Sequence, residues 1–253
     1  MRIADAHLAL VAETFWREAD PSPSQSWPCD LEKVIALTLR LAVISLPSLT
    51  LQCIENWLEK RGTPYEFPCE NRHVRGCIVA YRGSGLIFVD GSDPIEERRF
   101  TLAHEVAHFL LDYYEPRQRA RTRLGDGILE VFDGLHPPTV DERIEGVLSS
   151  ISIVPYVHLM EQRGAVKLKR ATIWQAENRA DELALEILAP VKIVYSDLAK
   201  ICTGCSYFVC FESAKQTLIE KYGLPKLIAH GYAQRIAHQL TGGPSVLFEL
   251  GLE

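Results

Sequence analysis

The chain has 253 residues, of which 47% are hydrophobic and 24% charged, a balance typical of a soluble globular protein with one large domain or two small ones. Its formal net charge of -6 argues against a protein that binds nucleic acids mainly by electrostatic attraction. Asp5, His7 and Glu13 interrupt any apolar core near the start, so no signal peptide is evident. The longest apolar run, residues 34–46, is too short to span a bilayer, and we expect a cytoplasmic protein.

The first part of the chain is expected to be helical. The apolar patterns predict helices over residues 3–19 and 31–45. A third helix is predicted from a cap at Ser48 or Thr50 to Arg61.

β character follows these helices. Residues 76–81 and 86–89 are rich in β-branched and aromatic residues, and Arg82-Gly-Ser-Gly85 between them favours a hairpin turn. Residues 65–67 are a candidate third strand. The sequence therefore predicts a small antiparallel sheet, with residues 86–89 as an edge strand that could bind an extended peptide by strand addition.

The second half is expected to be helical apart from its first stretch. Residues 112–138 are interpreted as a solvated loop. In the alternative interpretation, the arginines within it form a basic lip that contacts an acidic or nucleic-acid-bound partner. Two capping boxes, at residues 139–142 and 172–175, predict helix starts. The predicted helices are residues 139–163, kinked at Pro155, 172–188, 211–222 and 226–240.

The cysteines do not indicate a disulfide framework, because they are seven in number and irregularly spaced. Cys202 and Cys205 form a single CxxC with Cys210 nearby, but no fourth ligand for a structural zinc site is evident. Reduced thiols are expected, as is usual in the cytoplasm.

The stretch His104-Glu-Val-Ala-His108 is the most informative part of the chain. It lies in an apolar segment that is typical of one helix, so the two imidazoles, one turn apart, point to the same side. Such a pair can bind one metal ion, with Glu105 placed to transfer a proton. The motif also arises by chance, as a surface glutamate with two incidental histidines. A buried helix seldom carries three such polar side chains without a function, however, because unpaired buried polar groups are costly.

A third ligand is expected from another element, since catalytic zinc usually has three protein ligands and a water molecule. Glu177 and Asp181 lie one turn apart on the helix predicted over residues 172–188. Glu177 is the candidate ligand, and Asp181 can accept the remaining N–H of a ligand histidine. In the alternative interpretation both are ordinary surface acids. The rival third ligands, ranked lower, are Glu182, Glu186, Glu142 and Glu145.

The segments Arg99-Phe-Thr-Leu-Ala-His-Glu-Val-Ala-His108 and Glu177-Asn-Arg-Ala-Asp181, with the residues up to 190, resemble the ImmA/IrrE family of bacterial and phage metallopeptidases. The resemblance implies that His104, His108 and Glu177 bind zinc and that Glu105 is the catalytic acid/base. Asp181 matches a position that is Asp or Asn in the family pattern, and its spacing from Glu177 also resembles the third-ligand segment of gluzincins. Family members typically cleave a helix-turn-helix transcriptional repressor in the cytoplasm.

The resemblance covers roughly residues 46–190 and implies three parts. We expect an N-terminal helical extension over residues 1–45, a metallopeptidase domain over 46–190 with an enlarged insert at 112–171, and a C-terminal helical region over 191–253. The expected fold class is α+β, mostly helical, with a small antiparallel sheet beside the HExxH helix.

The expected activity is hydrolysis of a peptide bond with Zn²⁺ as the cofactor, although Mn or Co could occupy such a site in vitro. Tyr156, His158 and Tyr195 are candidates for stabilising the oxyanion. The expected partner is a DNA-binding repressor, with no membrane and no direct nucleic-acid binding. The alternatives are a metal-containing regulatory protein, of a phage or toxin–antitoxin type, that binds a regulator without cleaving it, and DNA binding through the arginine run.

Overall fold

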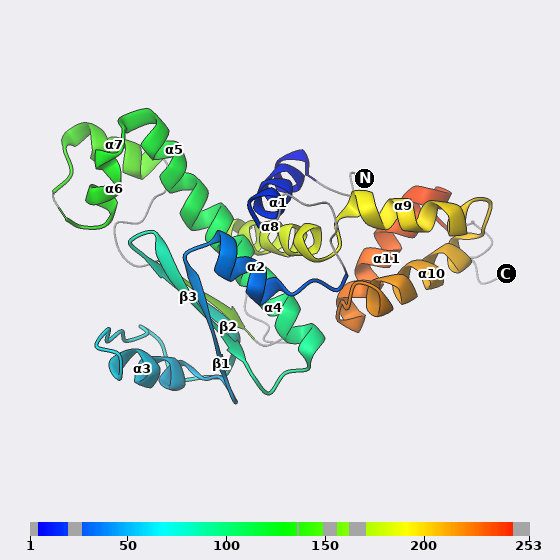
Figure 1. The fold of residues 1–253 in the computed structure, drawn as a ribbon, viewed down its shortest axis with the longest axis horizontal. Helices are drawn as coiled ribbons and strands as arrows, with labels where there is room; N and C mark the ends of the chain where they lie inside the picture. Colours follow the sequence, from blue (N-terminus) through cyan, green and yellow to red (C-terminus); the bar gives the residue numbers. More distant parts are fainter. Residues whose placement is uncertain (1–4, 20–26, 136, 149–155, 162–170, 245–253) are drawn as a thin grey trace. The chain divides into compact units, whose positions relative to one another are not determined.

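The structure, a computed structural model, contains two compact units. One unit comprises residues 31–181 and contains the HExxH helix, and the other comprises residues 1–30 and 182–253. The domain boundaries expected near residues 46 and 190 stay predictions. The structure describes residues 5–19, 27–135, 137–148, 156–161 and 171–244 (Figure 1).

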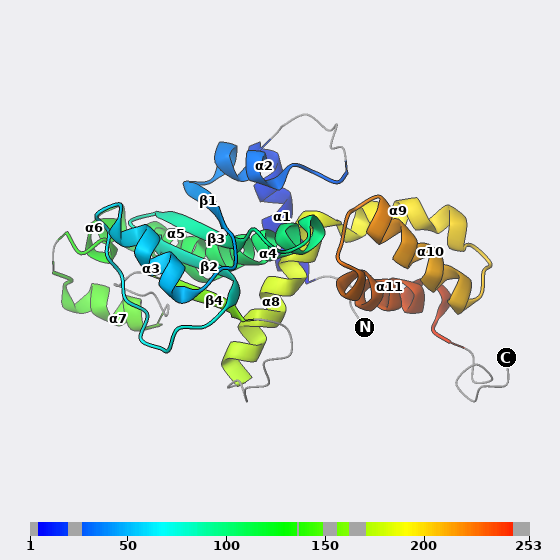
Figure 2. The same ribbon diagram turned by 90° about the horizontal axis from the view of Figure 1, so that it is seen from below.

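A mixed sheet lies at the centre of the unit 31–181. Among the described residues it has four strands in the order β1-β3-β2-β4 (Figure 2). β2 pairs antiparallel with β3 and with β4, whereas β1 runs parallel to β3. The α+β class is thus confirmed, with a parallel strand added to the expected antiparallel pairing. The strands are β1 (Leu41–Leu46), β2 (Val74–Tyr81), β3 (Ser84–Asp90) and β4 (Tyr156–Glu161).

The predicted hairpin is confirmed as β2 and β3. Its loop consists of Arg82 and Gly83, since Tyr81 pairs with Ser84. Both loop residues have positive φ, at 52° and 75°, as a tight two-residue hairpin of matching twist requires. Residues 65–67, in contrast, do not form the candidate third strand.

Two segments predicted to be entirely helical contain strands. Residues 31–45 form α2 (Leu31–Thr38) followed by β1, where the β-branched Val43 and Ile44 pair with β3. Residues 156–161, predicted as the end of a helix, form β4, which pairs antiparallel with β2. The predicted kink at Pro155 lies outside the described residues.

The order of strands also corrects the predicted edge. β3 lies between β1 and β2, so the prediction that residues 86–89 form an edge strand is wrong. The edges of the described sheet are β1 and β4. A tight hairpin shows that two consecutive strands pair with each other. It does not show which strand from a distant segment pairs with their outer sides.

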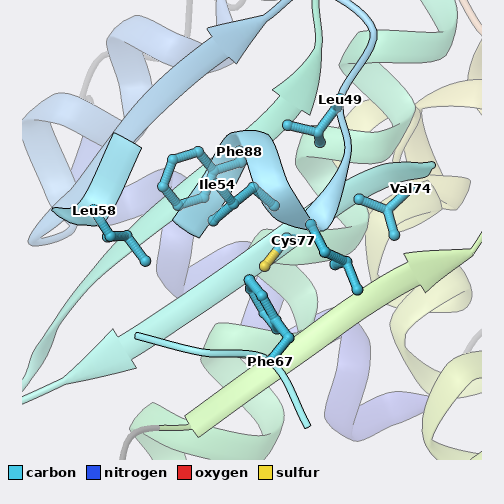
Figure 3. Close-up of a cluster of buried hydrophobic side chains, with 8 residues drawn as sticks. Leu49, Ile54, Leu58, Phe67, Val74, Cys77 and Phe88 are labelled. Atoms are coloured by element: carbon cyan, nitrogen blue, oxygen red, sulfur yellow. The ribbon is translucent and has the colours of Figure 1, made fainter. Parts of the chain in front are cut away.

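One face of the sheet is covered by α3 (Leu51–Glu59), which begins where predicted. Thr50 caps it, because its side-chain oxygen accepts the backbone N–H of Cys53 at 3.2 Å. Ile54 of α3 packs with Cys77 of β2 and Phe88 of β3 in a buried apolar cluster (Figure 3). Val157 and Leu159 of β4 pack against the same cluster. His158, which lies between them, therefore faces the opposite side of the sheet.

Replacing Thr50 by alanine is expected to destabilise the protein by about 1 kcal/mol, because the N–H of Cys53 loses its partner at the start of α3. The urea unfolding midpoint of the metal-free protein measures the effect. Thr50→Ser keeps the oxygen and is expected to stay within a few tenths of a kcal/mol of the parent. Equal midpoints for all three proteins would show that the cap contributes no stability.

The other face of the sheet is covered by α4 (Ile95–His108) (Figure 1). Gly76 of β2 allows a close approach here: a Cβ atom built on it would lie 2.6 Å from Thr101 Cγ2 and 2.9 Å from Glu105 Oε1. The helix continues without a break into the π-helical segment η1 (Phe109–Tyr114). The sheet and α4 thus enclose the side chains of the HExxH motif.

The segment predicted as a solvated loop is instead helical. α5 (Glu115–Leu124) contains all four arginines of the run, followed by α6 (Gly127–Phe132) and α7 (Val140–Leu148). Arg117 is buried and pairs with Asp133 at 2.7 Å, so it is not available to a partner. The capping box of α7 is confirmed, with Thr139 and Glu142 exchanging hydrogen bonds between side chain and backbone.

The remaining elements are helices. The predicted tail helices and the first helix are confirmed with shifted ends, and a helix that was not predicted follows Pro190. Within the unit 1–30 and 182–253, Asp197 accepts hydrogen bonds from Lys221 and Tyr222. Among the described residues, no helix combines the length and apolar character needed to cross a membrane. The helices are α1 (Ala6–Ala19), α8 (Ala171–Leu188), α9 (Val191–Cys202), α10 (Tyr207–Glu220) and α11 (Lys226–Thr241).

Candidate metal centre

The HExxH motif lies at the end of α4, fully inside the unit. Glu96 and Glu97 in the first turn favour a helix start, because carboxylates stabilise the positive end of the helix dipole. His104, Glu105 and His108 follow and are each at most 1% exposed. The two Nε2 atoms of the histidines lie 3.2 Å apart and point toward each other. They form a pair of nitrogen donors on one helix face, as the spacing predicts.

Each of these histidines is held from behind by a carboxylate. His104 Nδ1–H donates to Asp181 Oδ1 at 2.8 Å, and His108 Nδ1–H donates to Asp112 Oδ2 at 2.7 Å. A donor hydrogen on Nδ1 leaves the lone pair of Nε2 available to a metal ion. Burial lowers the pKa of His108, which also favours the neutral, ligating form of this ring.

Asp112 was missed from the sequence. It lies one turn after His108, in η1, and the spacing alone could have indicated it. Its segment was interpreted as the start of a loop, however. π-Helical turns are rare and recur at functional sites, and here such a turn carries an acid that orients a histidine.

Glu177 comes to the same place from α8. Its Oε2 atom lies 3.9 Å from His104 Nε2, and its Oε1 atom lies 3.0 Å from His158 Nε2. Asp181, one turn later on α8, reaches His104. The structure therefore brings together the four residues His104, His108, Glu177 and Asp181 that the sequence singles out.

His158 of β4 completes the cluster. Its Nδ1 atom lies 3.0 Å from Glu105 Oε2, and its ring stacks on that of His108 with centroids 3.6 Å apart. Burial by itself lowers the pKa of His158. Hydrogen bonds and charge from Glu105 and Glu177 outweigh this effect and raise the pKa to about 10. In the metal-free protein this ring therefore bridges the two acids as an imidazolium at neutral pH.

The other residues considered from the sequence lie in other settings. Tyr156 of β4 donates its hydroxyl hydrogen to Asp112 at 3.3 Å, whereas Tyr195 lies on α9 in the other unit. Burial, followed by the negative charges nearby, raises the pKa of Tyr156, so its hydroxyl keeps its hydrogen. Among the rival ligands, Glu142 caps α7 and Glu186 accepts the backbone N–H of Val191. Glu182 lies 3.8 Å from Arg235, and the side chain of Glu145 lies outside the described residues.

The donor set fits a divalent metal ion such as zinc. One ligand atom each from His104, His108, His158 and Glu177 lies within 4.8 Å of the others, and imidazole nitrogen with carboxylate oxygen is a combination that zinc prefers. A further indication is Glu105 Oε1, which is buried and has no hydrogen-bond partner among the described residues. Such an orphaned carboxylate oxygen is costly in a purely structural core.

Comparison with known proteins identifies one part of the chain. Residues 65–129 match the family model described as the IrrE N-terminal-like domain, Peptidase_M78. No curated protein and no solved structure matches the chain. The matched segment extends from the loop before β2 to α6, and it contains the HExxH motif and Asp112 but ends before Glu177. Residues 65–129 are therefore similar to the IrrE N-terminal-like domain of the M78 peptidases, the ImmA/IrrE family that the motifs resemble, and this similarity points to a metallopeptidase.

Proposed function

We propose that the protein is a zinc-dependent endopeptidase. The observation that carries the proposal is the orientation of the two HExxH histidines: their Nε2 atoms face each other at 3.2 Å, while carboxylates hold both Nδ1 atoms. With both Nδ1 atoms donating to carboxylates, the Nε2 lone pairs of the two imidazoles face each other, an arrangement that a cation between them would stabilise. The family match over residues 65–129 supports the same conclusion.

His104, His108 and Glu177 would hold the metal ion, which when bound lowers the pKa of water and polarises the scissile carbonyl group. Asp181 and Asp112 keep the histidines in the ligating tautomer. Glu105 accepts the proton of the attacking water and delivers it to the leaving amine. Its buried position keeps bulk water from competing for that proton.

The substrate is proposed to be a protein, and specifically a helix-turn-helix repressor in the cytoplasm, as the family resemblance implies. The edge strand that could bind an extended segment of such a substrate is β4 rather than the predicted residues 86–89. β4 offers backbone hydrogen-bonding groups beside the cluster, because it carries His158.

The test combines metal analysis of the purified protein with cleavage of co-expressed repressor proteins. We expect about one zinc ion per chain, repressor fragments of defined size, loss of cleavage with a chelator, and recovery on adding zinc. Stoichiometric metal with tight repressor binding but no fragments would instead favour the regulatory binding protein that does not cleave.

Asp112→Ala is expected to weaken metal binding about tenfold to a hundredfold, because His108 loses the acid that orients its ring. Competition with a chromophoric chelator measures the dissociation constant. Asp126→Ala is a matched control, since this acid is exposed and pairs with an exposed arginine, Arg121, on the surface. Equal affinities of both variants and the parent would show that Asp112 does not support a ligand.

A further inference from the structure

His158 on β4 contacts both Glu105 and Glu177, but the proposed three-ligand centre gives it no role once a metal ion is bound. We propose that His158 is a fourth protein ligand of the metal, so that the centre is closed when the metal is bound in this conformation. The inference rests on the proposed function, because it assigns one more residue to the same ion.

All three histidines of the cluster share one pattern. Each has one ring nitrogen within hydrogen-bonding distance of a carboxylate that is not among the four candidate ligands: Asp181 for His104 and Asp112 for His108, both near 2.8 Å. His158 repeats it, with Glu105 Oε2 at 3.0 Å from Nδ1. Histidines that bind metals almost always donate their second N–H to such an acceptor. His158 is thus oriented like a ligand.

The second nitrogen of His158 faces the other donors. Its Nε2 atom lies 3.0 Å from Glu177 Oε1, comparable with the 3.2 Å between the Nε2 atoms of His104 and His108. Two nitrogens bound to one tetrahedral zinc ion lie roughly 3.3–3.4 Å apart, given bonds of about 2.0–2.1 Å. Both distances are close to this value, and one ligand atom from each of the four residues lies within 4.8 Å of the others.

The sheet determines the position of the fourth donor. His158 pairs with Ile78 of β2 in the register of β4, while its neighbours Val157 and Leu159 pack into the cluster under α3. If β4 shifted by one residue along β2, the side chain of His158 would point into that apolar cluster. The register of the two strands is therefore strongly specified. The imidazole is consequently held over His108 by strand pairing rather than by a loop.

Closure has a consequence for the reaction. Metal sites with four protein ligands are structural, whereas catalytic sites keep one position open for water. His158 also donates a hydrogen bond to Oε2 of Glu105, the proposed proton acceptor, and so occupies that oxygen at the same time. The centre described here is therefore latent, and hydrolysis requires that His158 leave the metal.

The first test counts bound histidines without any mutation. The 253-residue protein is labelled with ¹⁵N and loaded with ¹¹³Cd, and coupling between cadmium and ring nitrogens is recorded. Three coupled imidazoles support the inference, and two would overturn it. Failure of the protein to bind any divalent metal would instead overturn the proposed function itself, so the two failures are distinguishable.

The second test uses cobalt as a spectroscopic probe and compares His158→Gln with the parent. We expect the variant to bind the metal about tenfold more weakly or worse, and its visible Co²⁺ bands to change on adding azide, because a coordination position is now open. The parent spectrum should not respond to azide. The same metal affinity and the same azide response in both proteins would overturn the inference.

His73→Gln is the matched control, since this histidine is exposed in the same unit and is not part of the cluster. It should behave like the parent in both measurements. Circular dichroism of the metal-free variants checks that they fold. Should His158→Gln fail to fold, the cadmium experiment on the parent protein still decides between three and two histidine ligands.

Discussion

Replacing Glu105 by glutamine is expected to reduce peptide cleavage by about a hundredfold to ten-thousandfold while the metal stays bound. Glutamine has nearly the shape of glutamate but cannot accept and return a proton at neutral pH, and general acid–base catalysis contributes about this factor. Glu105 is fully buried beside the paired histidines, so no other carboxylate on α4 can replace it. The value of kcat/KM for a cleaved repressor, with metal content measured on the same sample, gives the result.

Two controls separate the role of Glu105 from general damage to the helix. Glu96→Gln changes a glutamate in the first turn of the same helix and should leave both cleavage and metal content unchanged. His104→Ala, in contrast, is expected to lose metal and cleavage together, because it removes a donor of the central pair. Full proteolysis by the Glu105→Gln protein would overturn the role assigned to this residue.

Gly76→Ala is expected to destabilise the protein by about 1–3 kcal/mol, the usual cost of adding a methyl group to a tightly packed core. The new Cβ atom would lie 2.6 Å from Thr101 Cγ2 and 2.9 Å from Glu105 Oε1, closer than such atoms can approach. Either the strand moves away from α4 or Glu105 is displaced. We therefore expect cleavage to fall together with the midpoint of urea unfolding.

A second substitution shows whether this contact is the cause. Thr101→Ser removes the methyl group that would lie nearest to the new side chain, so the double variant should regain part of the lost stability. Gly127→Ala is the matched control, because a Cβ atom there meets nothing within 4 Å. If Gly76→Ala unfolds at the same urea concentration as the parent, the proposed close packing of β2 on α4 is incorrect.

The sequence predicted the parts of the centre that depend on local geometry. The pairing of His104 with His108 follows from one helical turn, and the neighbouring positions of Glu177 and Asp181 follow from another. That the two helices meet was inferred from the need of zinc for a third protein ligand, and the resemblance to a family implies the same. The family match confirms that resemblance over residues 65–129, whereas the ligand roles stay predictions.

The missed parts depend on contacts between distant segments. His158 could not be assigned because its strand exists only through pairing with β2, and the isolated sequence there is equally compatible with a helix. β1 was missed for the same reason, since its partner β3 follows about forty residues later in the chain. The spacing of one helical turn from His108 could have indicated Asp112, but the segment that follows it was interpreted as a loop because of its arginines.

β4 has a role in solubility that is separate from the histidine it carries. By pairing along β2 it satisfies backbone groups that would otherwise face solvent beside a largely buried, apolar strand. Unpaired strands of that kind recruit strands from other chains and lead to aggregation. Variants of this protein that lack β4 should therefore precipitate on expression, even when α4 and its histidines are intact.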